Sequence, residues 1–411
     1  MTTQDHTGIE ARDGAVPFGD LPFWLRQVCR IASRIACGRL DIRVPDGRTF
    51  RFAAERPGRR AALTIHDGAF ARRVLLRGDF GFAESYLRGE WDSPDLTQLL
   101  LLILENDQVS RTMVPERRWV TWLQRGREIL NRNTRAGARR NIRAHYDLGN
   151  SFYEAWLDPS MTYSSAIFAP GNDDLAAAQA SKYRRLARMT GIGPGDQVLE
   201  IGFGWGGFAE FAAREIGCRI TGLTLSREQH AYATRRIAEA GLADRVELKL
   251  QDYRDERNSY DRIVSIEMFE AVGEAFWDVF FQQMHDRLRP GGRAGLQVIT
   301  IRDDQFERYR RGTDFIRRYV FPGGLLPPHG AMSRLGVAHD LPLIHDDGFA
   351  PDYARTLAVW RDRFQASWPA VARLGFDERF RRLWTYYLSY CEAGFLNRNI
   401  DVRQMVFIRP S

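Results

Sequence analysis

The sequence predicts an α/β protein in which a Rossmann-like, doubly wound and mostly parallel sheet follows a smaller N-terminal α+β domain. Three observations favour this fold class. The chain has 411 residues, which is too long for one ordinary hydrophobic core. Strand-like and helix-like segments alternate from residue 195 onward, as they do in parallel sheets with crossover helices. A glycine-rich turn follows the first of these strands, at a position where such sheets bind ligands.

The N-terminal third is expected to fold separately from the rest. A polar, acidic stretch predicts a disordered tail over 1–20, followed by a domain over 21–130 that we expect to associate with lipid or membrane. Within it, alternating residues and turn signals indicate a β-rich unit at 41–80, and a helical stretch follows at about 96–131. Residues 131–144 are rich in Arg, Asn and Gly and are predicted to be the linker.

The catalytic domain is expected to span 145–411, with alternating strands and helices and a long insertion at about 302–338. Ser226 is a plausible helix N-cap, because a serine hydroxyl can accept a hydrogen bond from the first helical turn. The predicted strands are 196–202, 218–225, 245–252, 260–268, 293–301, 340–349 and 401–409. The predicted helices are 207–216, 226–241, 274–291, 351–366 and one that reaches about 395.

The formal net charge is +7, and ten arginines fall between residues 111 and 143. Such a run is either a solvated helix and linker or a surface that attracts a polyanion. No RNA-binding, zinc-finger or helix-turn-helix signature supports nucleic acid, so an anionic membrane is the polyanion we expect. A basic amphipathic segment at 22–40 is either an interfacial helix or a helix packed on its own domain.

The spacing of cysteines and histidines predicts neither a metal site nor a disulfide framework. The eight histidines lack an HExxH-type pattern, and the four cysteines form no CxxC pair, which fits a reducing cytosol. No signal peptide and no apolar run of bilayer length is present, so a cytoplasmic location is expected. The cysteines are Cys29, Cys37, Cys218 and Cys391.

The stretch LEIGFGWGGFAE (199–210) approximates the dinucleotide fingerprint through Gly202, Gly204 and Gly207. Glycines there either let backbone amides approach a ligand or only pack a helix on a strand. The second strand does not end near an acid that could bind a ribose, which argues against a nicotinamide cofactor. Glu200, a carboxylate within the first strand, suits a cationic ligand such as S-adenosylmethionine. Asp252 ends the third strand, where it could either accept the adenine amino group or be a solvated loop residue.

Seven stretches of the sequence resemble the cyclopropane-fatty-acyl-phospholipid synthases and the related mycolic acid cyclopropane synthases and methyltransferases. A further stretch, GFAESYLRGEWDSPDL (81–96), resembles the smaller N-terminal domain of the phospholipid-acting members, so nearly the whole chain is covered. The seven stretches are HYDLGNSFYEAWLDPSMTYSSAIF, VLEIGFGWGGFAEFAA, GLTLSREQ, SIEMFEAVG, DFIRRYVFPGG, DYARTLAVWRDRF and YYLSYCEAGF. On this resemblance, the residues expected to bind S-adenosylmethionine are Tyr163, Ser164, Glu200, Gly202, Gly204, Trp205, Gly206, Thr224, Leu225, Gln229, Asp252 and Tyr253.

The resemblance implies that a cis double bond of an acyl chain takes the methyl group of S-adenosylmethionine. A carbocation forms, a base removes a proton from the new methyl group, and a cyclopropane ring closes. In this family the base is thought to be a bound bicarbonate. The residues implied to hold it are Glu270, Tyr319 and the backbones of Ile266 and Ser165. A carbocation requires a dry, aromatic pocket. Glu270 would then keep its proton on burial, although a surface carboxylate at a helix start is the alternative.

Two positions depart from the family pattern. Ser165 stands where members usually carry Cys, and Gln297 stands where many carry His. A backbone amide at Ser165 can do the same work, but Gln297 cannot titrate or carry charge. The departures therefore predict either weaker binding of bicarbonate or a changed ring-closing deprotonation. Cys391 matches a family cysteine near the site, or is simply a small buried hydrophobic residue.

Four functions follow as hypotheses. The first is cyclopropane formation on unsaturated phospholipid acyl chains at an anionic membrane surface, by an enzyme that is peripherally associated with the membrane. The second gives methyl- or methylene-branched chains by the same chemistry. The third is a non-catalytic lipid-binding relative, against which Glu270 and the intact glycine loop argue. The fourth, nucleic-acid methylation, lacks its expected motif after the fourth strand. A homodimer is implied only by the resemblance.

Overall fold

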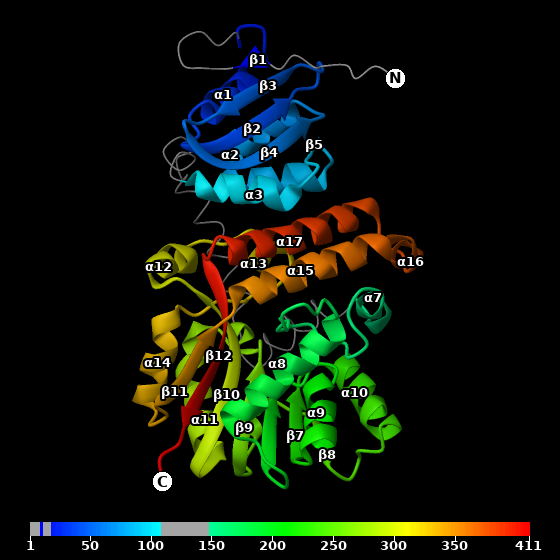
Figure 1. Cartoon of the computed structure of the whole chain (residues 1–411), viewed down its shortest axis with the longest axis vertical. Coiled ribbons are helices and arrows are strands. Elements are labelled where there is room, and N and C mark those ends of the chain that lie inside the picture. Colours follow the sequence, from blue (N-terminus) through cyan, green and yellow to red (C-terminus); the bar gives the residue numbers. More distant parts are fainter. Residues whose placement is uncertain (1–8, 11–17, 108–147) are drawn as a thin grey trace. The chain divides into compact units, whose positions relative to one another are not determined.

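The computed structural model describes three parts of the chain, which are residues 9–10, 18–107 and 148–411 (Figure 1). The chain divides into two compact units. Unit 1 comprises residues 1–121 and 375–397, and unit 2 comprises residues 122–374 and 398–411.

Two predicted features lie outside the described residues. These are the arginine-rich segment 111–143 and the linker 131–144, so both stay predictions. The predicted tail over 1–20 is described only at residues 9–10 and 18–20. There, Ile9 pairs with Phe50 of a neighbouring strand, and Phe18 is buried, which differs from the disordered tail that we expected.

The described residues of unit 1 form a five-stranded sheet with the order β1-β3-β2-β4-β5, together with four helices. Pairing in this sheet is mixed, since β2 runs antiparallel to β3 and parallel to β4. The strands are β1 (Ile9–Glu10), β2 (Cys37–Arg43), β3 (Thr49–Ala53), β4 (Arg56–Ile65) and β5 (Trp91–Asp92). The helices are α1 (Phe23–Ala32), α2 (Ala69–Leu87), α3 (Leu96–Glu105) and α17 (Glu378–Leu396).

The β-rich unit predicted at 41–80 is wrong for its second half, because α2 begins at Ala69. The turn signal at Asp67 marks a helix start instead of a hairpin: its carboxylate accepts a hydrogen bond from the Ala69 amide at 2.8 Å. Gly78 then adopts φ 55° and ψ −135° and kinks the helix. The sequence pattern was obscured because this kink interrupts the helical period.

Helix α17 lies in unit 1, although the sequence placed it in the catalytic domain. The Thr97 hydroxyl donates to the Glu392 carboxylate at 2.8 Å, and Arg382 donates to the Asp92 carboxylate at 2.6 Å. The Thr97–Glu392 pair is separated by 295 positions in the chain. Such a contact leaves no local trace in the sequence, so the expected boundary could not include it.

Of the two interpretations of segment 22–40, the structure favours a helix packed on its own unit, which is α1. Its apolar stripe of Leu25, Cys29 and Ala32 is buried within the protein. At its start, Phe23 and Trp24 remain exposed, with exposed fractions of 59% and 37%. The helix therefore uses most of its apolar face for its own unit and leaves one aromatic pair at the surface.

Unit 2 contains a seven-stranded sheet with the order β11-β12-β10-β9-β6-β7-β8 (Figure 1). Neighbouring strands from β8 to β10 pair parallel, and β12 pairs antiparallel with both β10 and β11. The predicted Rossmann-like fold class is thus confirmed. The strands are β6 (Gln197–Ile201), β7 (Arg219–Thr224), β8 (Val246–Leu250), β9 (Tyr260–Ile266), β10 (Leu288–Ile301), β11 (Leu343–Gly348) and β12 (Ile400–Ile408).

The helices of unit 2 largely follow the expected alternation. Ser226 caps α10 as predicted, since its hydroxyl accepts from the Gln229 amide at 3.3 Å. The helices are α7 (Asn150–Glu154), α8 (Leu175–Thr190), α9 (Gly207–Phe211), α10 (Arg227–Glu239), α11 (Trp277–Arg287), α12 (Asp303–Arg311), α13 (Phe315–Tyr319), α14 (His329–Ala338), α15 (Ala350–Ala366) and α16 (Trp368–Arg373). The predicted helix 207–216 continues from α9 into a π-helical turn at Ala212–Ile216.

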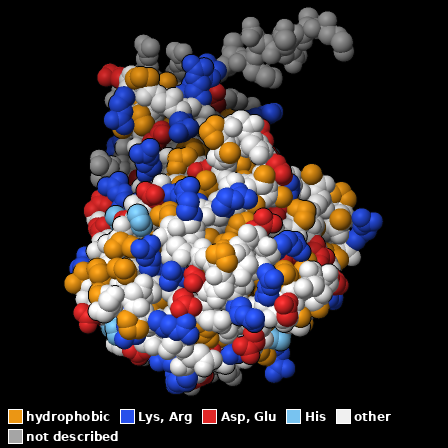
Figure 2. Space-filling view, turned by 60° about the horizontal axis from the view of Figure 1, so that its bottom comes forward, with side chains coloured by type: hydrophobic (Ala, Val, Ile, Leu, Met, Phe, Trp, Pro, Cys, Tyr) orange, Lys and Arg blue, Asp and Glu red, His pale blue; other side chains and the backbone are white. Residues whose placement is uncertain are grey.

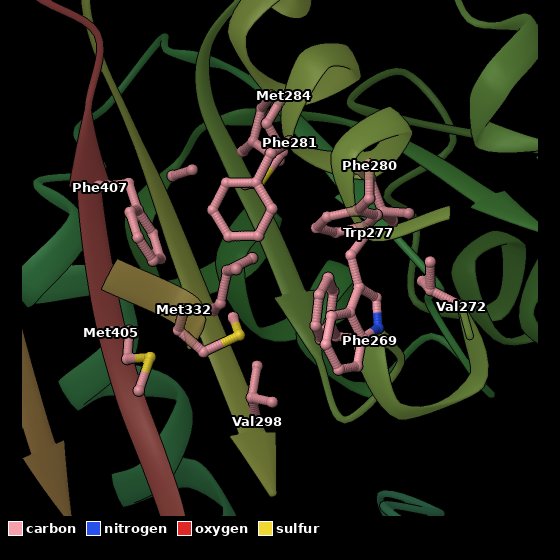
Figure 3. Close-up of a cluster of buried hydrophobic side chains, with 14 of the residues drawn as sticks. Phe269, Val272, Trp277, Phe280, Phe281, Met284, Val298, Met332, Met405 and Phe407 are labelled. Atoms are coloured by element: carbon pink, nitrogen blue, oxygen red, sulfur yellow. The ribbon is translucent and has the colours of Figure 1, made fainter. Parts of the chain in front are cut away.

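Two hydrophobic clusters cover the two faces of this sheet. One joins β6, β7 and β8 to α8, α9 and α10. The other joins β9, β10 and β12 to α11 and α14, and Figure 3 shows its aromatic and methionine side chains. Phe269 belongs to this second cluster and stacks on Trp277 with ring centroids 5.7 Å apart. It fixes the short turn Phe269–Ala271, on which Glu270 lies.

The topology locates the site. Strand β6 lies between β7 and β9, so the strand order reverses there. In open parallel sheets, ligands bind beyond the carboxyl ends of the strands at such a reversal. The loops after β6, β7, β8 and β9 meet at this edge and carry most of the predicted site residues. Among the described residues, no helix is long and apolar enough to cross a bilayer.

Candidate functional site

The glycine loop after β6 has the backbone that close ligand approach requires. Gly202 has φ 86°, and a Cβ there would lie 2.7 Å from the Met268 side chain. Gly204 also has a left-handed φ, of 56°, but a Cβ there would meet no atom within 4 Å. The space above Gly204 is therefore open, as the approach of a ligand demands. Beyond it, the indole nitrogen of Trp205 donates to the Asn150 side chain at 2.8 Å.

Glu200 lies on β6, immediately before this loop, with only 3% of its surface exposed. Its Oε2 atom is buried and has no hydrogen-bond partner among the described residues. Burial raises the pKa of Glu200 to about 8, and the charge of Lys182 opposes this rise. An unpaired buried carboxylate is costly unless a ligand supplies a donor or a cation. The structure therefore fits a positively charged ligand at this loop.

Thr224 and Gln229 are both buried at the end of β7 and the start of α10. The Thr224 hydroxyl donates to the Gln229 side chain at 3.1 Å and accepts from the Ser226 amide at 3.2 Å. Leu225, between them, is partly exposed. Thr224 and Gln229 thus form a buried polar pair at the carboxyl end of β7, next to the glycine loop.

Asp252 and Tyr253 follow β8, but Asp252 is already engaged. Its carboxylate forms an ion pair with Arg254 at 2.6 Å and also accepts from the Arg254 amide at 3.0 Å. The predicted contact of Asp252 with an adenine amino group stays a prediction. Tyr253 packs edge-on against Phe280 at 5.4 Å, and burial raises its pKa to about 12.

The segment Tyr163–Ser165 contacts a residue that the sequence analysis missed. The Lys182 ammonium, which is fully buried, donates to the Ser164 hydroxyl at 2.6 Å. Burial lowers the pKa of Lys182 to about 7, against the opposing charge of Glu267. Its signal was present in the sequence, because Lys182 falls on the apolar stripe of α8 with Ala178 and Leu186.

Tyr163 belongs to an aromatic cluster, defined here as Tyr153, Trp156, Tyr163, Phe321 and Trp360. The ring of Tyr163 lies 5.3 Å from Trp360, 5.6 Å from Trp156 and 6.5 Å from Phe321. Trp156 and Trp360 are almost completely buried. Such a cluster excludes water and presents ring faces that attract positive charge.

Glu270 lies on the short turn after β9 that Phe269 anchors. Its Oε1 accepts from the Ile299 amide at 2.5 Å, and its buried Oε2 has no partner among the described residues. Burial and the nearby charge of Glu267 raise the pKa of Glu270 to about 8. At pH 7, Glu270 therefore carries a proton that it can donate. Ile299 on β10 supplies the amide at Glu270, and the predicted contact of the Ile266 backbone with bicarbonate stays a prediction.

Glu267, the residue directly after β9, is the main omission of the sequence analysis. Its Oε1 accepts from both the Ser165 amide and the Gln297 side chain, each at 2.8 Å. Its Oε2 accepts from the Tyr353 hydroxyl of α15 at 2.6 Å. Burial raises the pKa of Glu267, whereas Lys182 and the three donors lower it. Two residues predicted to hold an anion are thus bound to a carboxylate of the chain itself.

The other predicted residues lie as follows. Gln297 pairs with Ile266 in the register of β10 and β9, and its Oε1 accepts from Gln404 of β12 at 3.0 Å. Tyr319 ends α13, with its ring 5.2 Å from that of Phe315. Cys391 is a partly exposed cysteine on α17 of unit 1. No group of three or more His, Cys, Asp or Glu in the described parts is placed to hold a metal ion.

Comparison with known proteins identifies a family for this chain. Residues 133–405 match the family model for mycolic acid cyclopropane synthetase. The chain is 41% identical over 364 residues to tuberculostearic acid methyltransferase UfaA1 of Mycobacterium tuberculosis, which covers 85% of this chain and 84% of that protein. It is 34% identical over 381 residues to the Escherichia coli cyclopropane-fatty-acyl-phospholipid synthase, covering 90% and 96%.

Among solved structures, the mycolic acid cyclopropane synthase CmaA1, complexed with SAH and CTAB, superposes with a TM-score of 0.62 at 30% identity. That match covers 66% of this chain and 98% of the CmaA1 chain. The cyclopropane synthase MmaA2 from Mycobacterium tuberculosis gives the same TM-score of 0.62 at 29% identity.

Proposed function

This chain belongs to the mycolic acid cyclopropane synthetase family, and we propose that it methylates the cis double bond of an unsaturated phospholipid acyl chain to form a cyclopropane fatty acid. It is a methyltransferase, and S-adenosylmethionine supplies the methyl group. The observation that carries the proposal is the unpaired, buried carboxylate of Glu200 beside the open glycine loop. A sulfonium or ammonium ligand satisfies such a carboxylate, whereas a pyrophosphate does not.

The residues of the chain have distinct tasks in this proposal. Glu200 and the glycine loop hold the methyl donor, and Thr224 with Gln229 offers polar contacts beside it. The aromatic cluster keeps water from the positive charge that forms on the acyl chain. Glu270, with its raised pKa, is protonated at neutral pH and can donate a hydrogen bond to an anion. The base that completes the reaction is bicarbonate, as the family resemblance implies, or a group of the chain.

A second product class is favoured by two observations. Gln297 replaces a histidine that many family members carry, and the 41% identical relative is named for tuberculostearic acid, not for a cyclopropane. Loss of a proton from the acyl chain instead of from the new methyl group would give a methylene branch. The substrate class and the methyl donor are the same in both cases.

One experiment tests both products. The purified full chain is incubated with S-adenosylmethionine and vesicles of unsaturated phospholipid, and the fatty acids are analysed by mass spectrometry. We expect a ring-containing acyl chain, and a methylene branch would select the second product class. Vesicles of saturated phospholipid are the control and should give no product. An unchanged fatty-acid profile with unsaturated vesicles would contradict the proposal.

We also propose that the enzyme associates peripherally with anionic membranes. The net charge of +7 and the exposed Phe23 and Trp24 at the start of α1 support this. On the face shown in Figure 2, basic and acidic side chains are interspersed. Binding to anionic vesicles should weaken as salt rises, and the double substitution Phe23→Ser, Trp24→Ser should weaken it further. Salt-independent binding would contradict this proposal; a homodimer stays a prediction from resemblance.

A further inference from the structure

Glu267 has an unusual backbone for its residue type. Its φ is 50°, in the left-handed region, although it is not a glycine. This conformation is strained for a residue with a Cβ, because the Cβ comes too close to the following carbonyl oxygen. Residues held in such conformations cluster at functional sites, where the surroundings over-determine them. Here the surroundings are hydrogen bonds: Glu267 also donates its own amide to the Gln297 carbonyl at 2.7 Å.

The donors around Glu267 are those expected for an external anion. The Ser165 amide and the residue at the family histidine position, Gln297, were both implied to act on bicarbonate. In the structure both donate to Glu267 Oε1 at 2.8 Å. The Ser165 amide has one hydrogen, so it cannot serve a bicarbonate at the same time. The Tyr353 hydroxyl completes the shell on Oε2.

Charge also disfavours a further anion at this place. Glu267 and Glu270 already interact, since the charge of Glu267 raises the pKa of Glu270. Lys182 is the basic residue whose charge favours the ionised form of Glu267. Adding bicarbonate beside an ionised Glu267 would bring two like charges into one buried site, which is unfavourable. The site instead contains its anion as a side chain.

We propose that the Glu267 carboxylate takes the place of bicarbonate and is itself the catalytic base of the reaction. In the ring-forming case, a C–H bond of the transferred methyl group breaks and its proton passes to a Glu267 carboxylate oxygen. The electron pair of that bond forms the third ring bond with the cationic carbon. A neutral acyl chain and a neutral carboxylic acid result, and the acid then releases its proton to solvent. This assignment rests on the proposed methyl transfer to an acyl double bond.

The surroundings suit this role. Burial raises the pKa of Glu267, which makes the ionised carboxylate a stronger base. The three donors fix both oxygens, so the carboxylate is positioned before the substrate arrives. Tyr353, which holds Oε2, is also 6.2 Å from Trp360 of the aromatic cluster, measured between ring centroids. Tyr353 thus connects the proposed base to the aromatic cluster that shields the cationic carbon.

The test uses the full chain in buffer freed of carbon dioxide, with and without added bicarbonate. Wild-type turnover should be independent of bicarbonate. Glu267→Gln preserves size and hydrogen-bond acceptance but cannot take the proton, so turnover should fall about 100-fold or more. Glu267→Gly removes the side chain at a backbone conformation that glycine adopts readily. Its turnover should be equally low and should recover at least tenfold with bicarbonate or formate, which can occupy the vacated space.

A second readout needs neither methyl donor nor lipid. Bicarbonate should not change the thermal unfolding of the wild type or of Glu267→Gln, but should raise the Tm of Glu267→Gly, because only that variant offers the anion a place. A structural role for Glu267 would not produce this selective binding. It also shows that the glycine variant is folded.

Two results would overturn the inference without touching the proposed function: wild-type turnover that requires bicarbonate, or Glu267→Gln that keeps its rate. Failure of the proposed function has a different signature, namely a wild-type protein that forms no methylated lipid under any condition, although it binds S-adenosylmethionine.

Discussion

Glu200 and Glu267 are two buried carboxylates at the same edge of the sheet, but their hydrogen bonding is opposite. Glu200 lies on β6, and Glu267 directly follows the neighbouring strand β9. Glu200 has a buried oxygen without any partner among the described residues. Glu267 has three donors on its two oxygens. An unpaired carboxylate gains when a cation arrives, whereas a satisfied carboxylate is built to keep its own charge. In the proposed reaction, this difference separates a ligand-binding end of the site, at Glu200, from a proton-accepting end, at Glu267.

The largest effect expected at the proton-accepting end, apart from Glu267 itself, is that of Glu270→Gln. The amide can still accept from Ile299, so the fold is preserved, but the titratable proton is lost. We expect turnover to fall about 100-fold, measured as methylated fatty acid by mass spectrometry. Glu274→Gln, in an exposed ion pair with Arg310, is the control and should retain its rate. Near wild-type activity of Glu270→Gln would remove this residue from the proton-handling end.

At the ligand-binding end, Glu200→Gln should weaken binding of S-adenosylmethionine. A bound cation favours the ionised form of Glu200, and removing a buried charge that faces a cation typically costs a few kcal/mol, so we expect the Kd to rise about 10- to 100-fold. Turnover at saturating donor should change much less. Isothermal titration calorimetry gives the Kd, with the exposed Glu239→Gln on α10 as control. If the Kd were unchanged while turnover at saturating donor collapsed, the two ends would not be distinct.

Glu200→Gln should also remove a pH dependence of the folding stability. The pKa of Glu200 is about 8 in the folded chain against an ordinary value of 4.5, so the folded state binds a proton between these values that the unfolded state releases. Stability therefore falls as pH rises from about 5 to about 8. Glu200→Gln removes this loss, and its Tm relative to wild type should be several degrees higher at pH 8.5 than at pH 5.5. For Glu239→Gln the difference should not depend on pH.

The smallest effect is expected for Gln404→Leu, which acts through Gln297. Gln404 donates to Gln297 Oε1 at 3.0 Å and so orients the amide whose nitrogen faces Glu267. Without it the amide can rotate, and we expect turnover to fall about 3- to 10-fold, with about 1–3 kcal/mol lost in stability. Gln282→Leu, on the exposed face of α11, serves for comparison. A loss of stability with unchanged turnover would show that Gln404 supports packing alone.

The ligand-binding end was largely predictable because its signals are local. The glycine loop, Glu200, Thr224 and the Ser226 cap all lie within one strand–helix–strand–helix run, where spacing alone places them. The site residues themselves stay predictions, since no ligand contact tests them.

The proton-accepting end was not predictable to the same degree because it is assembled from distant segments. Ser165 contacts Glu267 across 102 positions and Gln297 contacts it across 30. The register between β9 and β10 also decides which backbone amide faces Glu270. Gln297 of β10 pairs with Ile266 of β9, and the amide that donates to Glu270 is that of Ile299, two residues farther along β10. Lys182 is an exception, since its place on the apolar stripe of α8 was readable.

Helix α17 has a consequence for the order in which the chain can fold. Unit 1 requires residues 375–397, and unit 2 requires β12, which is made afterward and lies between β10 and β11. During synthesis, both units therefore wait for residues 375–411. Contacts of such long sequence separation slow folding and leave unpaired surface exposed meanwhile. A nascent chain that stops after α16 would lack a helix of one unit and, in the other, the strand that joins β11 to β10.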